Sequence, residues 1–245
     1  MNILSFTLSG SFAAFRDPTV TTNQTVYFIP SKSTIIGLLG AILGTKRGHN
    51  LGEIYGKEYM ELFKKTNIGI QLCNYPKKII LYTNHVSMKK SITKPVKSEL
   101  LESPQYVIYV QTSDEINEDL TERIRKNKFV FSPYLGHAYC PAKINFLNHN
   151  QAEKIDPINM KTNCVILDES DMVENNASIR VGDSGENPKI IIERHLHHFF
   201  DEDKFVRRVL KHWIPVNNSE YLIINDHERK LSKFVEIDGR AICIY

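Results

Sequence analysis

The sequence predicts an α+β fold, because segments with the two-residue period of β-strands are separated by segments with helical spacing. Residues 2–9 alternate apolar and polar side chains, which is typical of a half-buried strand. The clearest helix is expected at residues 31–44, where Ser31 or Ser33 can cap the start and Gly44 can end it.

The segments that follow complete a recognisable order of elements. They are a more polar helix over residues 51–65, two short strands at 68–73 and 78–83 joined by a turn, a strand at 106–111, an amphipathic helix at 115–126 and a strand at 143–147. The order is therefore strand, helix, hairpin, strand, helix, strand. This resembles the βαββαβ plan of ferredoxin-like and RRM-like domains. We expect such a domain over residues 1–150.

The pattern changes near residue 150. From there the sequence contains mainly short strand-like segments, expected at residues 163–167, 189–198, 221–225 and 234–237. We expect residues 151–245 to form a small β-rich C-terminal region that packs on the first domain.

Charge is distributed unevenly along the chain, although the formal net charge is only +3. Residues 1–103 carry 13 Lys and Arg against 6 Asp and Glu, whereas residues 104–245 carry 18 against 22. A basic half joined to a mildly acidic half suggests one face for a polyanion and another for protein partners.

Composition also argues against several classes of protein. The four cysteines, Cys73, Cys140, Cys164 and Cys243, form no close pair of the kind that zinc sites use, so we expect buried thiols and no metal. No segment approaches the ~20 apolar residues that span a bilayer, and the N-terminus lacks a basic leader, so we expect a cytoplasmic protein without membrane contact.

The start of the helix at residues 31–44 is a candidate anion site. Backbone N–H groups, hydroxyls and a lysine converge there at the positive end of the helix dipole, from Ser31, Lys32, Ser33 and Thr34. A P-loop is excluded because no glycine precedes Lys32 in this run, which disfavours a nucleotide hydrolase. One phosphate of an RNA strand is a better match, and a plain serine cap is the simpler alternative.

The same helix carries three glycines on one face, Gly37, Gly40 and Gly44. Each interior glycine costs ~1 kcal/mol relative to alanine, so the spacing suggests that something approaches the helix backbone closely. The sheet beneath the helix is the favoured partner, and a nucleic-acid backbone above it is the alternative.

Two motifs carry a resemblance to a known family. The run SFAAFRDP at residues 11–18, followed by TVYFIPSKSTIIGLLGAILG at residues 25–44, resembles the N-terminal signature of the Cas-five family of CRISPR-associated proteins, in the RAMP superfamily. The later run SPYLGHAYCPA, at residues 132–142, is similar to the subtype I-B branch of that family.

This resemblance implies a ferredoxin-like fold with a hairpin "thumb" inserted at about residues 84–103. It implies a single copy at the foot of a type I Cascade complex, where the protein caps the 5′ handle of the guide RNA (crRNA) in antiviral defence. The expected partners are this handle, the repeated backbone subunit and the large subunit, with target DNA contacted only indirectly. No cofactor is expected.

The stretch at residues 84–97 supports an RNA-binding role independently, because it is rich in lysine and contains no acid. Binding of single strands needs cations along the backbone and flat or apolar groups beneath the bases, and Met88 and Ile92 can supply the latter. A mobile solvated loop is the alternative. The full set of expected RNA-binding residues is Arg16, Ser31, Lys32, Ser33, Thr34, His85, Met88, Lys89, Lys90, Lys94, Lys97, Tyr134 and His137.

We expect no enzymatic activity, and a metal-independent endoribonuclease that processes repeat RNA is the alternative. RNA cleavage needs a general base and a general acid, and subtype I-C relatives use a Tyr, Lys and His set with an adjacent Lys-His pair. The one such pair here is Lys211-His212, beside Trp213, and Tyr134, His137 and Tyr139 are a local alternative. In subtype I-B systems a separate Cas-six endonuclease would be expected to cut the precursor.

A histidine-rich run at residues 195–198 raises the question of a metal site. On a strand His195 and His197 share a face and His198 points away, and no carboxylate is obviously paired with them. We expect an exposed histidine-rich strand that faces RNA or the large subunit.

Overall fold

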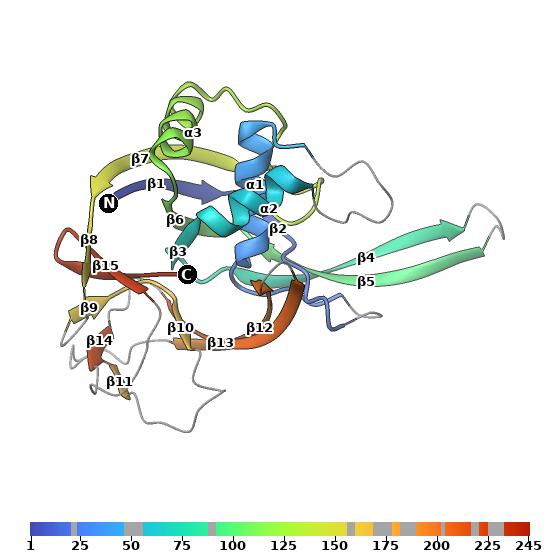
Figure 1. Ribbon diagram of the computed structural model, residues 1–245. Coiled ribbons are helices and arrows are strands. Elements are labelled where there is room, and N and C mark those ends of the chain that lie inside the picture. The colour runs from blue at the N-terminus through green and yellow to red at the C-terminus, as the bar shows by residue number, and fades with distance from the viewer. Residues whose placement is uncertain are drawn as a thin grey trace.

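Four strands of the N-terminal part form an antiparallel sheet in the order β3-β6-β1-β7 (Figure 1). These strands are β1 (Asn2–Ser9), β3 (Asn67–Leu72), β6 (Gln105–Gln111) and β7 (Lys143–Gln151). The computed structural model describes residues 1–20, 24–46, 56–87, 92–155, 160–168, 178–181, 190–201, 204–216, 221–224 and 233–245. Together with the helices below, this sheet confirms a mixed α/β fold composed mostly of strands.

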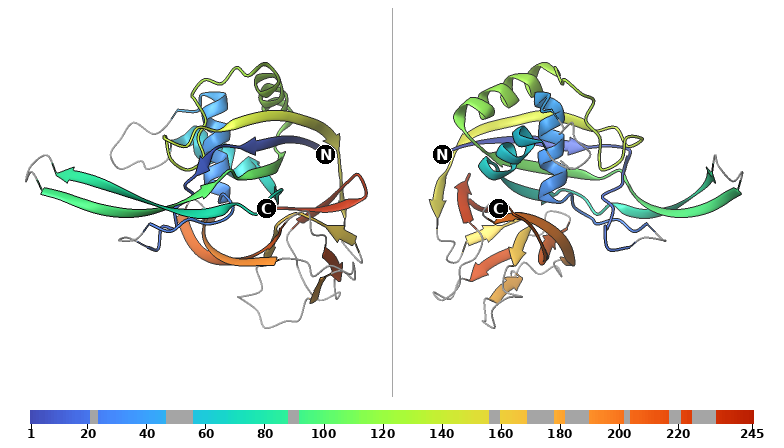
Figure 2. Two further views of the ribbon diagram at one scale, coloured as in Figure 1. Left: turned by 180° about the vertical axis from the view of Figure 1, so that it is seen from behind. Right: turned by 45° about the vertical axis from the view of Figure 1, so that its right-hand side comes forward.

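Three helices lie together on one face of this sheet (Figures 1 and 2). They are α1 (Lys32–Leu43), α2 (Lys57–Lys65) and α3 (Asp114–Lys126). Helix α1 begins as the sequence predicts, because Ser31 Oγ accepts a hydrogen bond from Thr34 N at 3.3 Å. It ends at Gly44, which has a left-handed backbone with φ of 83°. Residues 51–55 of the expected second helix lie outside the described residues.

The glycine face of α1 does not pack against the sheet, so this expectation was wrong. Gly37 is exposed, and no heavy atom of the described chain lies within 4 Å of the place where its Cβ would stand. At Gly40 such a Cβ would meet only the side chain of Thr45, at 3.4 Å. The close approach occurs at Gly44, where a Cβ would lie 2.9 Å from the side chain of Val130.

A long hairpin projects from the body of the molecule (Figures 1 and 2). It consists of β4 (Lys77–Ser87) and β5 (Ile92–Glu102), and the short strand β2 (Phe12–Ala13) pairs with β5 at its base. The expected pairing of the strands at 68–73 and 78–83 was wrong, because β3 pairs with β6 and β4 with β5. Asn74 lies between β3 and β4, where the chain enters the hairpin. Its side chain donates a hydrogen bond to Ser103 O and accepts one from Gln105 N, so the chain that enters the hairpin is bonded to the chain that leaves it.

The described residues of the C-terminal part lie mostly in strands, as expected for a β-rich region. Its described strands form three three-stranded sheets, β10-β13-β12, β11-β14-β9 and β16-β15-β8. The strands are β8 (Glu153–Ile155), β9 (Met160–Thr162), β10 (Ile166–Asp168), β11 (Ser178–Val181), β12 (Ile190–Asp201), β13 (Lys204–Pro215), β14 (Tyr221–Ile224), β15 (Lys233–Ile237) and β16 (Arg240–Ile244). The sequence did not identify β8, β9, β11, β13 or β16.

This part attaches to the free edge of β3. Ile68 and Tyr245 exchange backbone hydrogen bonds of 2.9 and 3.0 Å, and Val165 N donates to Ile70 O at 2.7 Å. Gly69 permits the contact, because a Cβ there would lie 2.9 Å from the carbonyl oxygen of Cys243. Buried Val165, Ile214 and Val216 also join the main hydrophobic core. Among the described helices, none combines the length and apolar character needed to cross a bilayer.

Candidate nucleic-acid interface

The extended segment at residues 24–28 organises the surface around the hairpin base. Gln24 N donates to Lys97 O of β5 at 3.2 Å, and Glu99 N donates to Gln24 O at 2.8 Å. On its other side the segment pairs with the Arg16 loop, since Tyr27 N donates to Phe15 O at 2.9 Å. Because the segment is bonded on both sides, it brings the Arg16 loop to the base of the hairpin.

Arg16 is exposed on this loop, and its Nη2 lies 3.4 Å from Val20 O, so its guanidinium is accessible to a phosphate. The neighbouring Asp17 shapes the loop by accepting hydrogen bonds from Thr19 N at 2.9 Å and Thr19 Oγ1 at 2.6 Å. Partial burial opposes ionisation of Asp17, but the hydrogen bonds from Thr19 and Tyr27 outweigh it and hold the pKa of this carboxyl below its ordinary value.

The start of α1 has the geometry of a serine cap. The hydroxyl of Ser31 is hydrogen-bonded to those of Ser33 and Thr34, at 2.9 and 3.0 Å. The ammonium of Lys32 lies 5.1 Å above the ring of Phe63 on α2. These groups serve the helix and its packing in this structure, and a phosphate contact at this place stays a prediction.

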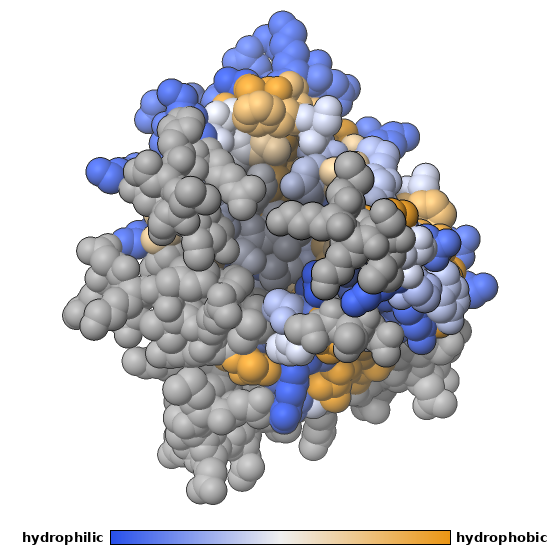
Figure 3. Space-filling view, turned by 90° about the vertical axis from the view of Figure 1, so that its right-hand side faces the viewer, coloured by the Kyte–Doolittle hydropathy of each residue, from blue (hydrophilic) through white to orange (hydrophobic). Residues whose placement is uncertain are grey.

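The hairpin exposes apolar and aromatic side chains along one of its faces. Tyr82 is 70% exposed, Val86 62% and Ile80 51%, and side chains two residues apart on a strand share a face. Lys97 is the cross-strand partner of Tyr82, so a cation and an aromatic ring lie side by side. Figure 3 shows the face from which the hairpin projects, with hydrophobic and hydrophilic side chains interspersed.

Among the residues expected in the hairpin, Lys94 is exposed and Lys97 half-buried. Met88, Lys89 and Lys90 lie outside the described residues, as does the side chain of His85. Sequence analysis missed Tyr82, because its lysine-rich stretch began only at residue 84. The missed signal is the strand predicted at residues 78–83, which leads directly into that stretch and places Ile80 and Tyr82 on one face with Asn84.

The loop at residues 132–142 packs directly on the chain leading into Arg16. Ala14 N donates to Leu135 O at 2.9 Å. Gly136 has a φ of 82°, and a Cβ there would overlap with the carbonyl oxygen of Ala14. The loop exposes Tyr134 and also His137 and Tyr139, whose rings stack with centroids 4.0 Å apart. The structure thus connects the two loops that contain Arg16, Tyr134 and His137.

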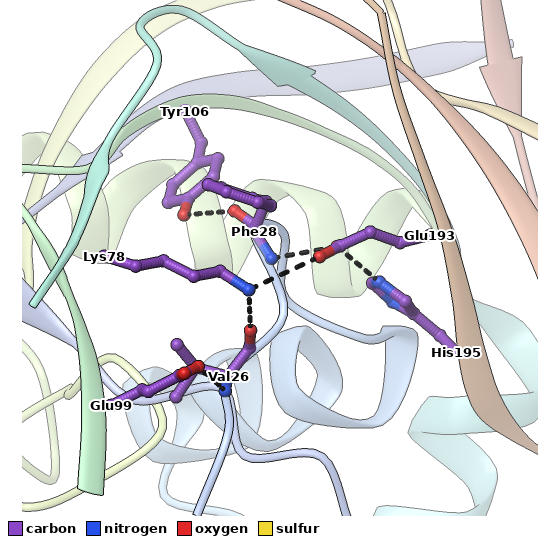
Figure 4. Close-up of polar contacts among 7 residues, drawn as sticks. All are labelled: Val26, Phe28, Lys78, Glu99, Tyr106, Glu193 and His195. Atoms are coloured by element: carbon purple, nitrogen blue, oxygen red, sulfur yellow. Dashed lines mark hydrogen bonds and ion pairs between the residues drawn. The ribbon is translucent and has the colours of Figure 1, made fainter. Parts of the chain in front are cut away.

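A polar network beneath this surface holds the 24–28 segment in place (Figure 4). From the hairpin, Lys78 Nζ donates to Val26 O at 2.6 Å and Val26 N donates to the Glu99 carboxylate at 3.4 Å. From the central sheet, the hydroxyl of buried Tyr106 donates to Phe28 O at 2.7 Å. From β12, Glu193 Oε2 accepts from Phe28 N at 2.9 Å. The hairpin, the central sheet and β12 therefore all contact the five residues of the 24–28 segment.

The expectation that His195 lies on an exposed strand was wrong. Its ring is completely buried and stacks on Tyr27, with centroids 3.9 Å apart. The face of β12 that carries Glu193 and His195 packs against the 24–28 segment, and that packing removes the imidazole from solvent. The side chains of His197 and His198 lie outside the described residues. Within the described chain, no three His, Cys, Asp or Glu residues are grouped as a metal site.

The Lys211-His212 pair is divided between two faces of β13. Adjacent residues of a strand point to opposite sides, and the imidazole of His212 is completely buried, 4.4 Å from that of His195. The ammonium of Lys211 lies over the ring of Trp213, at 4.4 Å. The two side chains therefore do not converge on one reacting atom.

Comparison with known proteins identifies relatives of the chain. Residues 3–210 match the family model described as CRISPR-associated protein (Cas_Cas5). A chain of a "CRISPR RNA-guided surveillance complex" is similar with a TM-score of 0.53 and 12% identity, over 91% of this chain and 90% of that one. A CRISPR protein from Archaeoglobus fulgidus is similar with a TM-score of 0.54 and 13% identity, over 100% and 98%.

A third solved structure, described as a Cas protein, aligns over 57% of this chain and 59% of that one, with 18% identity and a TM-score of 0.39. No curated protein matches the sequence. At identities this low, the two more similar structures establish a shared fold.

Proposed function

The chain belongs to the Cas_Cas5 family of CRISPR-associated proteins, and from this premise we propose that it is a non-catalytic, RNA-binding subunit of a type I Cascade complex. In this proposal it caps the 5′ handle of the crRNA and contacts the repeated backbone subunit and the large subunit, with target DNA reached only indirectly. Assignment to subtype I-B is part of the proposal and is supported by the loop at residues 132–142.

The projecting hairpin is the observation that carries this proposal. Single-stranded nucleic acids are held by cations along the backbone and by flat side chains that stack on bases. Tyr82 and Lys97 supply this combination on one face of the hairpin. Exposed Arg16 lies on the loop bound to the hairpin base through the 24–28 segment, so a strand that follows the hairpin can continue to Arg16.

We also propose that the first 150 residues follow the ferredoxin-like plan. The order β3-β6-β1-β7, with α1 and α2 between β1 and β3 and α3 between β6 and β7, supports it. The β4–β5 hairpin is then the inserted thumb, which spans Lys77 to Glu102 instead of the expected residues 84–103.

The absence of catalysis is supported by the separation of Lys211 from His212 on opposite faces of β13. An endoribonuclease remains the second candidate, because the stacked His137 and Tyr139 are both exposed. Tyr134 is exposed beside them, so a substrate RNA can reach all three rings without unfolding of the chain.

Two measurements test the proposal. Fluorescence anisotropy should show tighter binding to guide RNA with its 5′ handle than to the same RNA with a scrambled handle, and equal affinities would contradict capping. Incubation of labelled repeat RNA with the purified protein in EDTA should leave the RNA intact. Site-specific cleavage that is lost in His137→Ala would establish the second candidate, and cleavage lost only in His212→Ala would point to the Lys-His pair.

A further inference from the structure

The carboxylate of Glu193 joins three segments that are distant in the sequence (Figure 4). Its Oε2 accepts a hydrogen bond from Phe28 N at 2.9 Å and lies 2.9 Å from His195 Nε2. Its Oε1 lies 3.9 Å from Lys78 Nζ. Only 12% of the Glu193 side chain is exposed, so these partners replace most of its water.

A carboxylate in this setting has to be paired, because a buried charge without partners is strongly destabilising. An ionised carboxylate only accepts hydrogen bonds, so His195 Nε2 carries the proton of their contact. The imidazole is itself fixed by stacking on Tyr27. Glu193 is therefore held in one orientation from its own strand, and it presents a fixed negative charge to Lys78.

Lys78 brings the hairpin into this arrangement. Its ammonium donates to Val26 O at 2.6 Å and lies 4.4 Å above the ring of Phe28. Lys78 is directly opposite Leu101 in the hairpin register, at the point where the hairpin leaves the body. Farther out, Ile80, Tyr82 and Val86 are exposed. The contacts of Lys78 with the 24–28 segment and with Glu193 therefore lie at the base of the projecting part.

We propose that Glu193 is a positioning residue that fixes the β4–β5 hairpin to the C-terminal β12–β13 hairpin through Lys78 and the 24–28 segment. The C-terminal region then has a defined role, which is to set the direction in which the RNA-binding hairpin points. The consequence for RNA rests on the proposed function, whereas the mechanical link does not.

The sign of the effect on RNA affinity distinguishes positioning from simple electrostatics. Removal of an acid near a polyanion should by charge alone strengthen binding. If Glu193 positions the hairpin, Glu193→Ala should instead weaken binding of handle RNA by roughly threefold to thirtyfold. Glu193→Gln keeps an acceptor for Phe28 N and removes the charge opposite Lys78, so it should weaken binding in the same direction but less.

Hydrogen exchange measures the mechanical link without RNA. In Glu193→Ala the backbone amides at the hairpin base, Ile79, Leu100 and Leu101, should exchange about tenfold faster or more, because local opening becomes easier. Lys78→Met keeps the aliphatic stem and should produce the same change. In the double variant Lys78→Met/Glu193→Gln the exchange rates should be little higher than in either single variant, because both substitutions remove the same contact between Lys78 and Glu193. The control is Glu236→Gln, an exposed carboxyl on β15, which should change neither exchange nor binding.

Unchanged exchange at the hairpin base in both Glu193→Gln and Lys78→Met would overturn the proposal. These two conservative variants decide the question even if Glu193→Ala fails to fold. Unchanged or tighter RNA binding in Glu193→Gln, with faster exchange, would also overturn the positioning role, since the hairpin direction would then not matter. If the wild type itself does not distinguish handle RNA, the proposed function fails, and hydrogen exchange still decides the link.

Discussion

The imidazole of His195 stacks on the ring of Tyr27, with centroids 3.9 Å apart and planes inclined by 19°. Tyr27 belongs to the sequence run that resembles the family signature, and His195 comes from the C-terminal region. The contact therefore explains why an aromatic residue stands at this place in the run: it is the surface on which β12 docks. It also explains why His195 is a packing residue here, in a region whose sequence suggested an exposed strand.

Asp17, in the adjoining loop, should make stability depend on acid pH. Hydrogen bonds from Thr19 and Tyr27 keep its pKa below the ordinary value of 3.8, so the ionised form stabilises the fold. This contribution is present above the unfolded pKa and is lost as the pH falls through the lower folded pKa. Melting temperatures measured between about pH 5 and pH 2 should fall more steeply for the wild type than for Asp17→Asn.

The control for this prediction is Glu118→Gln, which removes an exposed carboxyl on α3. Its curve should run parallel to that of the wild type. A wild-type curve parallel to that of Asp17→Asn would show that the Thr19 hydrogen bonds do not survive in solution. Thr19→Ala, which removes one of them, should give an intermediate slope.

Two glycine-to-alanine variants should have opposite effects on stability. Gly136→Ala should destabilise the protein by at least about 2 kcal/mol, because its positive φ strains an L residue and its Cβ would overlap with the Ala14 carbonyl. Gly37→Ala should stabilise it by up to about 1 kcal/mol, because α1 gains a better helix former and the new methyl group meets open space. Denaturant unfolding measures both.

A stable Gly136→Ala protein would mean that the 132–142 loop is not pinned on Ala14. A destabilised Gly37→Ala protein would mean that the exposed face of α1 is covered. In an assembled complex, Gly37→Ala should reveal whether a partner approaches this face, since incorporation would then fall although the isolated protein is more stable.

The local features of this fold follow from the sequence, and the pairings between distant segments do not. Helix α1 is capped by Ser31 at its start and by Gly44 at its end, and both caps form through contacts within a few residues. The spacing of these two residues was therefore sufficient to predict both boundaries. The predicted partner of the strand at 68–73 was wrong. At its end Asn74 is hydrogen-bonded to Ser103 and Gln105, about thirty residues away, and the hairpin lies between these positions.

The same distinction holds for the candidate site, where single residues could be predicted and contacts between distant segments could not. Arg16 and the loop with Tyr134 and His137 could be selected by residue type, and the structure connects them through the Ala14 N to Leu135 O hydrogen bond. Glu193 could not be selected, because its role depends on Phe28, 165 positions away. No periodicity or motif in either segment refers to the other.

Tyr82 should be a base-stacking residue. Tyr82→Ala should reduce the binding free energy for handle RNA by about 1–3 kcal/mol if one base stacks on the ring. Tyr82→Phe keeps the ring and should bind almost as the wild type does, which separates stacking from hydrogen bonding by the hydroxyl. Because Tyr82 is 70% exposed, melting temperatures should hardly change. Equal affinity of the alanine variant and the wild type would remove this residue from the interface.

Lys94 and Lys97 should neutralise RNA phosphates along the hairpin. Each phosphate contact on a single strand contributes ~0.7 to the slope of log affinity against log salt, so Lys94→Ala/Lys97→Ala should flatten this slope by roughly 0.7–1.4. The matched control is Lys64→Ala/Lys65→Ala, which removes two exposed lysines from α2 and should leave the slope unchanged. Folding should be retained in both double variants, because neither removes a core side chain. The measurement is a salt titration of RNA affinity for the three proteins, with melting curves. Parallel slopes for the wild type and the hairpin variant would mean that these lysines only face solvent and that Arg16 and the start of α1 hold the handle.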